Sequence, residues 1–487
     1  MKSNKIISNY FYNMLYQVMN IIIPILTIPY ISRVLGVEGV GTNGYVSSIV
    51  IVFTAICTFG MINYGSKSIA YVRNKKDQIS NEFWGIWIVQ LSASIISIIV
   101  FILVFIILDY LNMKLLFVMQ IPNLIAALLD ISWFFIGIED IKKVSLRNLL
   151  VKVIALVLIF LLIKSERDLW LYMLINSASA LIGNIYFWIY IRRYIHFSKL
   201  KKLKIKTHMK GAFILLIPQL VAQIYTSLDR TIIGGVSNLV EVGYYDQSQK
   251  IARIALTIVT SLSIVLMPRI ANMYAENDDK NILTFLKKSL NFTIFTSVLI
   301  AAGIATISRE FVPLFFSNEF LVIIPYMMLS SFIIIFISIG GVFANQYALA
   351  TEKNKEYLIP LVSGAIINVV LNFILSSKLG ALGGVISIIV TEFIIMILRI
   401  ILVKKYINIK FLFSGTYKYI ISGMVSFAIS YFISYLQIGN LSIIILKGIV
   451  CIVIYLLTLL ILYKNKTNLL NVFKEKILNV SDKIGNI

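Results

Sequence analysis

The sequence has few charged residues, only eight prolines and two cysteines. Charged residues make up 14% of its 487 positions, whereas soluble globular proteins average about 25%. Hydrophobic residues make up 59%, and the mean hydropathy is +0.91. A chain with so few charges does not cover a water-exposed surface of ordinary composition, so most of its surface must face lipid. This composition argues against intrinsic disorder, a secreted disulfide-linked scaffold and a nucleic-acid-binding domain.

Cysteine and histidine each occur only twice. Cys57 and Cys451 lie in apolar runs, so we interpret both as small packed residues without a disulfide or a metal site. His196 and His208 flank a basic stretch without the spacing of metal ligands, and we expect both to be solvated. The sequence therefore predicts no metal site and no catalytic residues.

Long apolar runs dominate the chain. A spanning helix needs about 20 mostly apolar residues, and the runs do not alternate with period two, which argues against a membrane barrel. We predict an all-α integral membrane protein with about 14 transmembrane helices. They are 10–30, 41–62, 83–108, 114–138, 148–164, 170–191, 211–234, 245–268, 289–307, 320–345, 357–375, 381–403, 419–436 and 441–463.

The net charge of +22 reflects 44 lysines and arginines against 22 acidic residues. With the amino terminus in the cytoplasm, most of the basic residues fall in cytoplasmic segments, as the positive-inside rule requires. Both termini are then cytoplasmic. The outer loops hold only Arg33, Lys114, Lys164, Arg167, Arg309 and Lys378.

The basic stretch 192–210 is the natural boundary between two halves. Gly36-Val37 and Gly44-Tyr45 precede it, and Gly235-Val236 and Gly243-Tyr244 recur after it at the same spacing. This weak repeat fits parallel six-helix repeats. We predict an N-terminal lobe over 1–200, a C-terminal lobe over 201–403 around a central cavity, and two added spans with a cytoplasmic tail over 404–487.

Polar residues form one stripe on the first helix of each half. The stripes have the same helical spacing, and a stripe of amides cannot face hydrocarbon. Hydrogen bonding between helices is one explanation. We favour a hydrated cavity between the lobes, because both stripes lie on the leading helix of a half. Their members are Asn9, Asn13, Tyr16 and Asn20, and Gln219, Gln223, Thr226 and Arg230.

Six basic residues lie inside predicted spans. Lys152, Arg399 and Lys447 are close enough to span ends to extend their ammonium or guanidinium groups to the interface. Arg230, Lys250 and Arg253 lie deeper, where each would cost about 2.5–3.5 kcal/mol. We expect these three to hold an anionic group within the membrane. Structural pairing with Asp229 or Asp246 is the alternative.

Three acidic residues also lie inside predicted spans. Asp130, Asp229 and Glu392 carry protons, bind Na⁺ or neutralise a neighbouring cation, and the sequence does not rank these roles. Kinks are predicted at prolines within helices, namely Pro24, Pro29, Pro218 and Pro325.

Several motifs together carry a family resemblance that extends from the amino terminus to Ile270. The motifs are Pro29-Tyr30-Ile31-Ser32-Arg33, Asn63-Tyr64-Gly65-Ser66-Lys67, Asp130-Ile131-Ser132-Trp133-Phe134, Leu228-Asp229-Arg230 and Met267-Pro268-Arg269-Ile270. Through them the chain resembles the polysaccharide-transport branch of the MOP flippase superfamily, the Wzx-type flippases of O-antigen and capsule repeat units.

The resemblance implies alternating access of two six-helix lobes in a bacterial plasma membrane. It implies that the substrate is an undecaprenyl-diphosphate-linked oligosaccharide, moved from the inner to the outer leaflet. Further partners are membrane lipids and, as candidates, a polysaccharide polymerase and a chain-length regulator. No cofactor is implied, and coupling to Na⁺ or H⁺ stays open. Family position supports Arg33, Lys67, Asp229 and Arg230 as functional residues. The expected substrate-binding set is Arg33, Lys67, Arg230, Asn13, Asn20, Gln219, Gln223, Lys250 and Arg253, and Asp130, Asp229 and Glu392 are the expected coupling or charge-balancing residues.

Four alternatives stay open at this point. A multidrug exporter of the same superfamily more often has an acidic cavity, whereas the charge excess within these spans is basic. A lipid II flippase would differ only in the sugars of its substrate. A polysaccharide polymerase or lipid-linked glycosyltransferase usually carries a large external loop, and the outer loops here are short. A channel would need a filter segment, which the sequence lacks.

Overall fold

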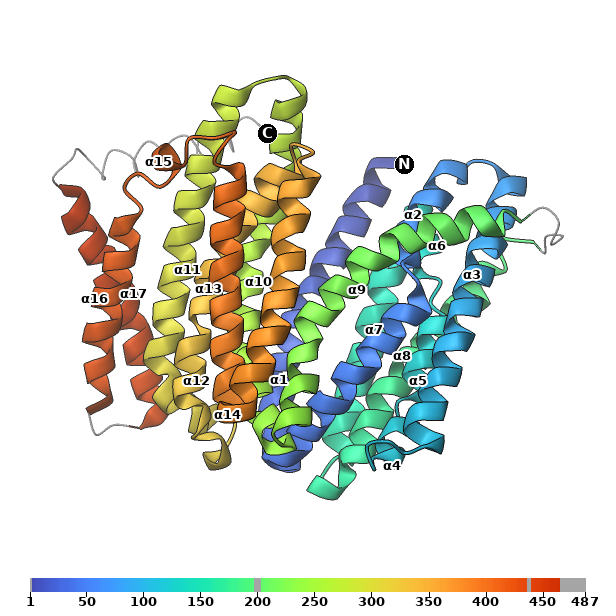
Figure 1. Cartoon of the computed structure of the whole chain (residues 1–487), viewed down its shortest axis with the longest axis horizontal. Helices are drawn as coiled ribbons and strands as arrows, with labels where there is room; N and C mark the ends of the chain where they lie inside the picture. The colour runs from blue at the N-terminus through green and yellow to red at the C-terminus, as the bar shows by residue number, and fades with distance from the viewer. Residues whose placement is uncertain (1, 197–202, 436–438, 465–487) are drawn as a thin grey trace. The chain divides into compact units, whose positions relative to one another are not determined.

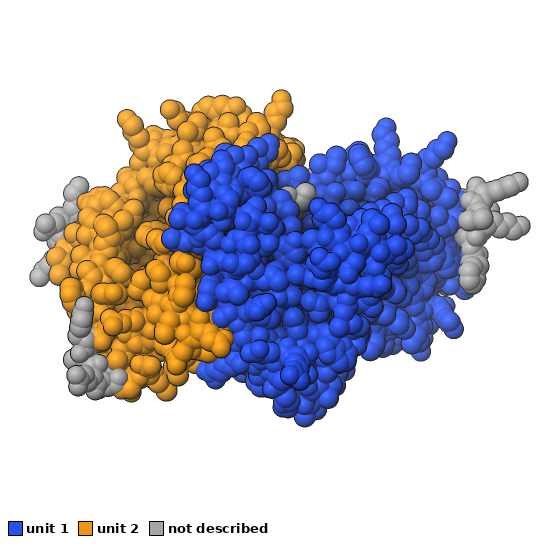
Figure 2. Space-filling view, turned by 60° about the horizontal axis from the view of Figure 1, so that its bottom comes forward, with its two compact units in different colours: residues 1–246, 365–384 blue, residues 247–364, 385–487 orange. Residues whose placement is uncertain are grey.

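The computed structural model describes residues 2–196, 203–435 and 439–464 of the chain. Every regular element in these ranges is helical (Figure 1). This confirms the predicted all-helical class. The chain divides into two compact units, residues 1–246 with 365–384 and residues 247–364 with 385–487, which Figure 2 colours separately.

The first unit contains the helices of the first half of the chain and the beginning of the second. It also takes the start of α10 (Leu239–Ala275) and the middle of α14 (Asn354–Val403). Its elements are α1 (Lys2–Thr58), α2 (Met61–Val72), α3 (Lys76–Ile102), η1 (Leu103–Ile107), α4 (Lys114–Val118), α5 (Ile121–Leu128), α6 (Ser132–Gly137), α7 (Ile141–Leu162), η2 (Glu166–Asp168), α8 (Leu169–Ile191) and α9 (Ile205–Val236).

The second unit contains the rest of α10 and both ends of α14. Its helices α16 (Tyr417–Tyr431) and α17 (Asn440–Lys464) pack against each other and against α11 (Asp279–Phe315). The other elements are η4 (Asn318–Phe320), α12 (Ile323–Ser330), α13 (Phe332–Gly341), η5 (Val342–Leu349), α15 (Ile409–Leu412) and η6 (Phe432–Tyr435).

Nine helices of the described residues are long and apolar enough to cross a membrane, and a tenth is added if the bent α9 counts as one span. The protein is therefore a multi-pass helical membrane protein. The prediction of 14 crossings exceeds this number for physical reasons. Two of the nine helices each cover two predicted spans, α16 has 15 residues, and the predicted span in α10 contains Asp246, Lys250 and Arg253.

Glycine breaks separate the paired spans. Inside α1 the backbone turns at Gly36, with φ 65° and ψ −175°, and inside α14 it turns at Gly380, with φ 55° and ψ −130°. A positive φ is costly for residues with a Cβ, so glycine is required there. Helix continues through Pro24 and Pro29, where the sequence predicts kinks. After the second break, Glu241 accepts a 2.6 Å hydrogen bond from the amide of Ala381 and so caps the new helix.

Each unit contains a turn of the same type between two of its own helices. Glu139 follows α6 with φ 58°, and Glu352 follows η5 with φ 60°. In each turn the next amide, of Asp140 or Lys353, donates a 2.8 Å hydrogen bond to a carbonyl five residues earlier. This pattern is the Schellman ending of a helix. The matching turns support an internal repeat, while the predicted lobe boundaries stay predictions.

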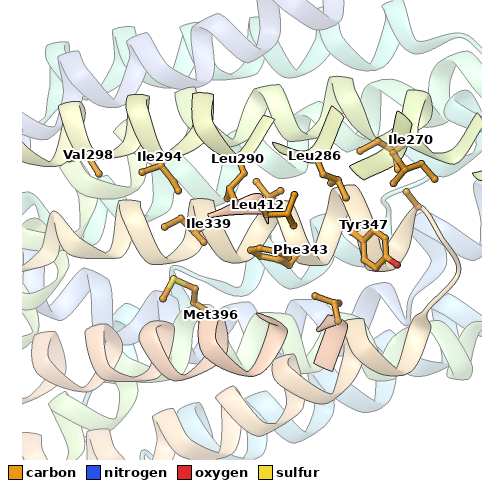
Figure 3. Close-up of a cluster of buried hydrophobic side chains, with 14 of the residues drawn as sticks. Ile270, Leu286, Leu290, Ile294, Val298, Ile339, Phe343, Tyr347, Met396 and Leu412 are labelled. Carbon is orange, nitrogen blue, oxygen red and sulfur yellow. The ribbon is translucent and has the colours of Figure 1, made fainter. Parts of the chain in front are cut away.

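The largest apolar core of the second unit joins helices that are distant in sequence. One buried cluster includes Leu290 and Ile294 of α11, Ile339 of α13, Phe343 of η5 and Met396 of α14 (Figure 3). Between membrane helices such cores stabilise by close packing, because lipid is as apolar as the side chains. Both cysteines are free and buried, as predicted.

His208 is a correction to the sequence analysis. Its side chain is buried, with the residue 2% exposed, rather than solvated. Its Nδ1 lies 3.0 Å from the Tyr64 hydroxyl, and its Nε2 lies 3.6 Å from a carboxylate oxygen of Glu82. Gly85 makes room for the ring, because a Cβ there would lie 2.7 Å from it. His196 is exposed, as expected.

Candidate functional site

The polar stripe of α1 meets a lysine of α7. The Lys152 ammonium donates a hydrogen bond to the side-chain oxygen of Asn20 and lies 5.4 Å from the centre of the Tyr16 ring. Lys152 is half-buried. The side chain of Asn13 lies outside the described residues. The polar stripe of α1 therefore lies beside a cation, Lys152, that the sequence analysis does not include among the site residues.

Lys152 lies farther from the ends of its helix than the sequence predicts. The predicted span begins at residue 148, but α7 runs from Ile141 to Leu162 over 22 residues. At 1.5 Å per residue this helix is about 33 Å long, close to the hydrocarbon thickness of a bilayer. Lys152 lies at its middle, where its side chain is far from either end.

The stripe of α9 lies against α1. Gln219 donates a 3.1 Å hydrogen bond to the hydroxyl of Thr58, and the hydroxyls of Thr231 and Ser48 are 2.6 Å apart. The backbone oxygen of Gln223 accepts a bond from Thr226, and the Gln223 side chain is half-buried. Hydrogen bonding between helices therefore explains part of this stripe.

Arg230 forms an ion pair across the turn between α9 and α10. Its Nη1 lies 3.3 Å from a carboxylate oxygen of Asp246, with side-chain exposures of 24% and 9%. This is the pairing that the sequence offers as an alternative. Because a guanidinium has five donors, one 3.3 Å contact leaves most of them available for other acceptors.

Asp229 lies in a different environment from that of Arg230. It is 1% exposed, and its carboxylate accepts hydrogen bonds from the Tyr245 hydroxyl and, at 2.7 Å, from the Asn372 amide. The hydroxyl of Ser376 in turn donates to the Asn372 oxygen. Sequence reasoning missed Tyr245 and Asn372, because Asn372 lies on α14, far along the chain.

The two copies of the glycine repeat contact each other. A Cβ on Gly41 would lie 1.7 Å from the backbone oxygen of Leu239, and a Cβ on Gly243 would lie 2.3 Å from that of Val37. Glycine allows this close approach of backbones. The contact brings α1 directly against the α9–α10 connection, next to the Arg230–Asp246 pair.

The remaining predicted residues are dispersed. Arg33 on α1 and Lys67 on α2 are exposed, and Asp130 is half-buried, with its carboxylate accepting a 2.9 Å bond from the amide of Ser132. In the second unit Lys250 and Arg253 are half-buried on α10, and Glu392 is buried on α14. Their roles stay predictions.

Lys447 of α17 is a second correction. The sequence predicts that it reaches the interface, but its side chain is 0% exposed. Its ammonium donates to a Glu310 carboxylate oxygen at 2.6 Å, to the Thr306 backbone oxygen at 2.9 Å, and to the Ser434 hydroxyl. Glu310 lies beyond the end of the predicted span 289–307, so the sequence does not suggest it as a partner.

No group of three or more histidine, cysteine, aspartate or glutamate side chains is placed to hold a metal ion within the described part of the chain. The polar groups described above on α1, α7 and α9 are amides, hydroxyls and cations. Such groups bind oxyanions and sugar hydroxyls.

Comparisons with known proteins agree with this architecture. Two curated relatives are each described as "Putative O-antigen transporter". The protein of Escherichia coli (strain K12) is 22% identical over 406 residues, 81% of this chain and 96% of its own. The protein of Shigella dysenteriae is 20% identical over 388 residues, 79% and 96% of the two chains.

Two solved structures share the fold. The lipid II flippase MurJ in an inward closed conformation has a TM-score of 0.73 at 15% identity, and the match covers 94% of this chain and 99% of that one. An inward-facing multidrug resistance MATE family transporter of the MOP superfamily has a TM-score of 0.63 at 14% identity. That match covers 84% of this chain and 99% of the transporter chain.

Residues 6–274, more than half of the chain, match the family described as polysaccharide biosynthesis protein. Because this match covers more than half of the chain, the chain belongs to the polysaccharide biosynthesis protein family.

Proposed function

We propose that this protein is a flippase that moves undecaprenyl-diphosphate-linked oligosaccharide repeat units from the inner to the outer leaflet of a bacterial plasma membrane. The product would feed the synthesis of capsule, O-antigen or exopolysaccharide. Membership of the family, two relatives described as O-antigen transporters, and the fold of a lipid-linked-substrate flippase support this proposal.

The observation that carries the proposal is the polar and cationic surface on helices that cross the membrane. A diphosphate with attached sugars does not cross hydrocarbon unaided, because its charges and hydroxyls would lose their hydration. Arg230, with 24% of its side chain exposed, can make charge-assisted hydrogen bonds to phosphate oxygens. Asn20, Gln219 and Gln223 supply amides for sugar hydroxyls.

The proposal includes the predicted topology. Fourteen crossings with both termini in the cytoplasm place the basic loops on the side of the anionic inner leaflet. The lobes would be 1–200 and 201–403, with 404–487 added. Lys250 and Arg253, on the second predicted lobe, would then provide the cations of that lobe for the same headgroup.

Asp229 is our choice for the coupling residue among the three acids within predicted spans. It is 1% exposed, the lowest value of the three, and Tyr245 and Asn372 donate hydrogen bonds to its carboxylate. A buried carboxylate within a membrane protein can carry a proton or bind Na⁺. Asp130 and Glu392 would balance neighbouring charge.

The test uses the variants Arg230→Ala and Lys250→Ala in a strain whose surface polysaccharide depends on this protein. We expect less polysaccharide at an unchanged level of protein in the membrane. Lys114→Ala, at an exposed lysine, is the control and should leave polysaccharide unchanged. Wild-type amounts of polysaccharide from both variants would remove these cations from the binding set.

Deletion of the protein tests the transport step itself. We expect the lipid-linked repeat unit to accumulate on the inner leaflet. Single unpolymerised units outside the membrane would instead indicate a polymerase.

The similarity to the lipid II flippase favours one second candidate function. A protein with that function would restore growth when the cell's own lipid II flippase is depleted. Under our proposal, expression of this protein does not restore growth, and surface polysaccharide alone depends on it.

A further inference from the structure

Two lysines in apolar helices of this protein have opposite environments. Lys447 is fully buried and uses all three of its donors on Glu310, Thr306 and Ser434. Lys152 is half-buried and bonds one neutral oxygen, on Asn20. Throughout the described ranges, no carboxylate lies within 4.0 Å of the Lys152 ammonium.

The protein therefore compensates the positive charge of Lys152 less completely than that of Lys447. An ammonium has three donors, and Asn20 accepts from one of them. The face of the Tyr16 ring attracts the positive charge but accepts no strong hydrogen bond. A cation at the middle of a membrane helix is costly, and it usually marks a substrate or ion pathway. Lys447 shows how this chain compensates a lysine that only supports the fold.

Lys152 is also the middle member of a row. Three lysines in α7 or directly after it each lie over a tyrosine of α1, and they follow one another from one end of α7 to the other. The pairs are Lys142 with Tyr12 at 4.6 Å, Lys152 with Tyr16 at 5.4 Å, and Lys164 with Tyr30 at 5.9 Å.

We propose that Lys152 binds the phosphate oxygens of a lipid-linked diphosphate at the middle of the membrane, with Asn20 and Tyr16 positioning its ammonium. The inference rests on the proposed flippase function and adds a binding residue that the sequence alone assigns to the interface. Lys142 and Lys164 provide cations near the two ends of the same helix, so an anionic headgroup that crosses along α1 and α7 meets positive charge at each depth.

The experiment measures binding of farnesyl diphosphate to the purified full-length protein in phosphatidylcholine nanodiscs. We expect Lys152→Met to weaken binding by about tenfold or more, the equivalent of one charge-assisted hydrogen bond. Lys152→Arg keeps the charge and should bind within about threefold of wild type. Lys418→Met is the matched control, because Lys418 also lies over a tyrosine ring, Tyr463 at 3.8 Å, but in the first turn of α16.

A second variant guards against loss of folding. Asn20→Asp places a carboxylate beside the Lys152 ammonium and so imitates the compensation of Lys447. It should retain the fold and still lose farnesyl diphosphate binding to a similar extent. Wild-type binding by both Lys152→Met and Asn20→Asp would overturn the inference and leave the flippase proposal standing.

Two further arms identify the ligand. Farnesol, which lacks phosphate, should not compete. Phosphatidylglycerol at the concentration that farnesyl diphosphate requires should not displace the probe, and if it does, the site belongs to bulk anionic lipid and the inference is wrong. Absence of farnesyl diphosphate binding by the wild-type protein would count against the proposed function itself.

Discussion

The buried pair of Lys447 and Glu310 allows a quantitative prediction. The two side chains are 0% and 6% exposed, and their charged atoms are 2.6 Å apart. Removing one partner leaves an uncompensated charge inside the second unit, which typically costs about 3–5 kcal/mol. We therefore expect Lys447→Met and Glu310→Leu each to raise the unfolding equilibrium constant by about a hundredfold or more.

Replacing both partners has a different expected result. When a buried pair is exchanged for apolar residues of similar volume, the change in stability is often near zero, because the cost of desolvating both charges disappears as well. The double variant Lys447→Met/Glu310→Leu should therefore be clearly more stable than either single variant. The Thr306 carbonyl and the Ser434 hydroxyl lose a donor in it, so full recovery is not expected.

The assay is unfolding of the purified protein in detergent, followed for the four members of the double-mutant cycle. The cycle isolates the coupling between the two side chains. Single variants that cost less than about 1 kcal/mol, the range of exposed ion pairs, would show that the charges are hydrated in solution. A double variant as unstable as the single variants would also refute the reasoning.

Three further predictions concern local contacts and use the same unfolding assay. Gly41→Ala should destabilise the protein, because its Cβ would lie 1.7 Å from a backbone oxygen, whereas Gly448→Ala, with open space around it, should not. Glu241→Ala removes the cap of the helix that follows Gly380 and should cost about 1 kcal/mol. His208→Ala should cost about 1–3 kcal/mol, because the Tyr64 hydroxyl then loses its bonding partner.

The helical class could be predicted from the sequence, because lipid offers the backbone no hydrogen-bond partners. A spanning segment must satisfy its own amides and carbonyls, so long apolar runs in this chain had to be helical. Helix ends were less predictable. The helix α7 begins at Ile141, but Lys142, Lys143 and Arg147 suggest a loop up to residue 148. Lysines in a first helical turn can extend toward the interface without ending the helix, and Arg147 bonds Asn184 within the helix bundle. The predicted span therefore began too late, and Lys152 was placed too close to its end.

Contacts between residues far apart in the sequence were not predictable. Asp246 was a candidate partner of Arg230, since the two lie on consecutive helices, and the structure confirms that pair. Glu310 and Lys447 are separated by every helix from α12 to α16, and no spacing rule links them. The same holds for Asp229 and Asn372, which meet only because α14 returns to the first unit.

Three cations within the helices differ in how many acceptors the protein offers them, and this difference yields a final expectation. Lys447 has a carboxylate and two further acceptors, Arg230 has one carboxylate at 3.3 Å, and Lys152 has a single amide oxygen. The less a cation is compensated by the protein, the more it gains from an anionic ligand. Substitution should therefore reduce stability in the order Lys447, Arg230, Lys152, and reduce farnesyl diphosphate binding in the reverse order. If substitution of the three cations reduced stability and farnesyl diphosphate binding in the same order, all three would serve the fold alone.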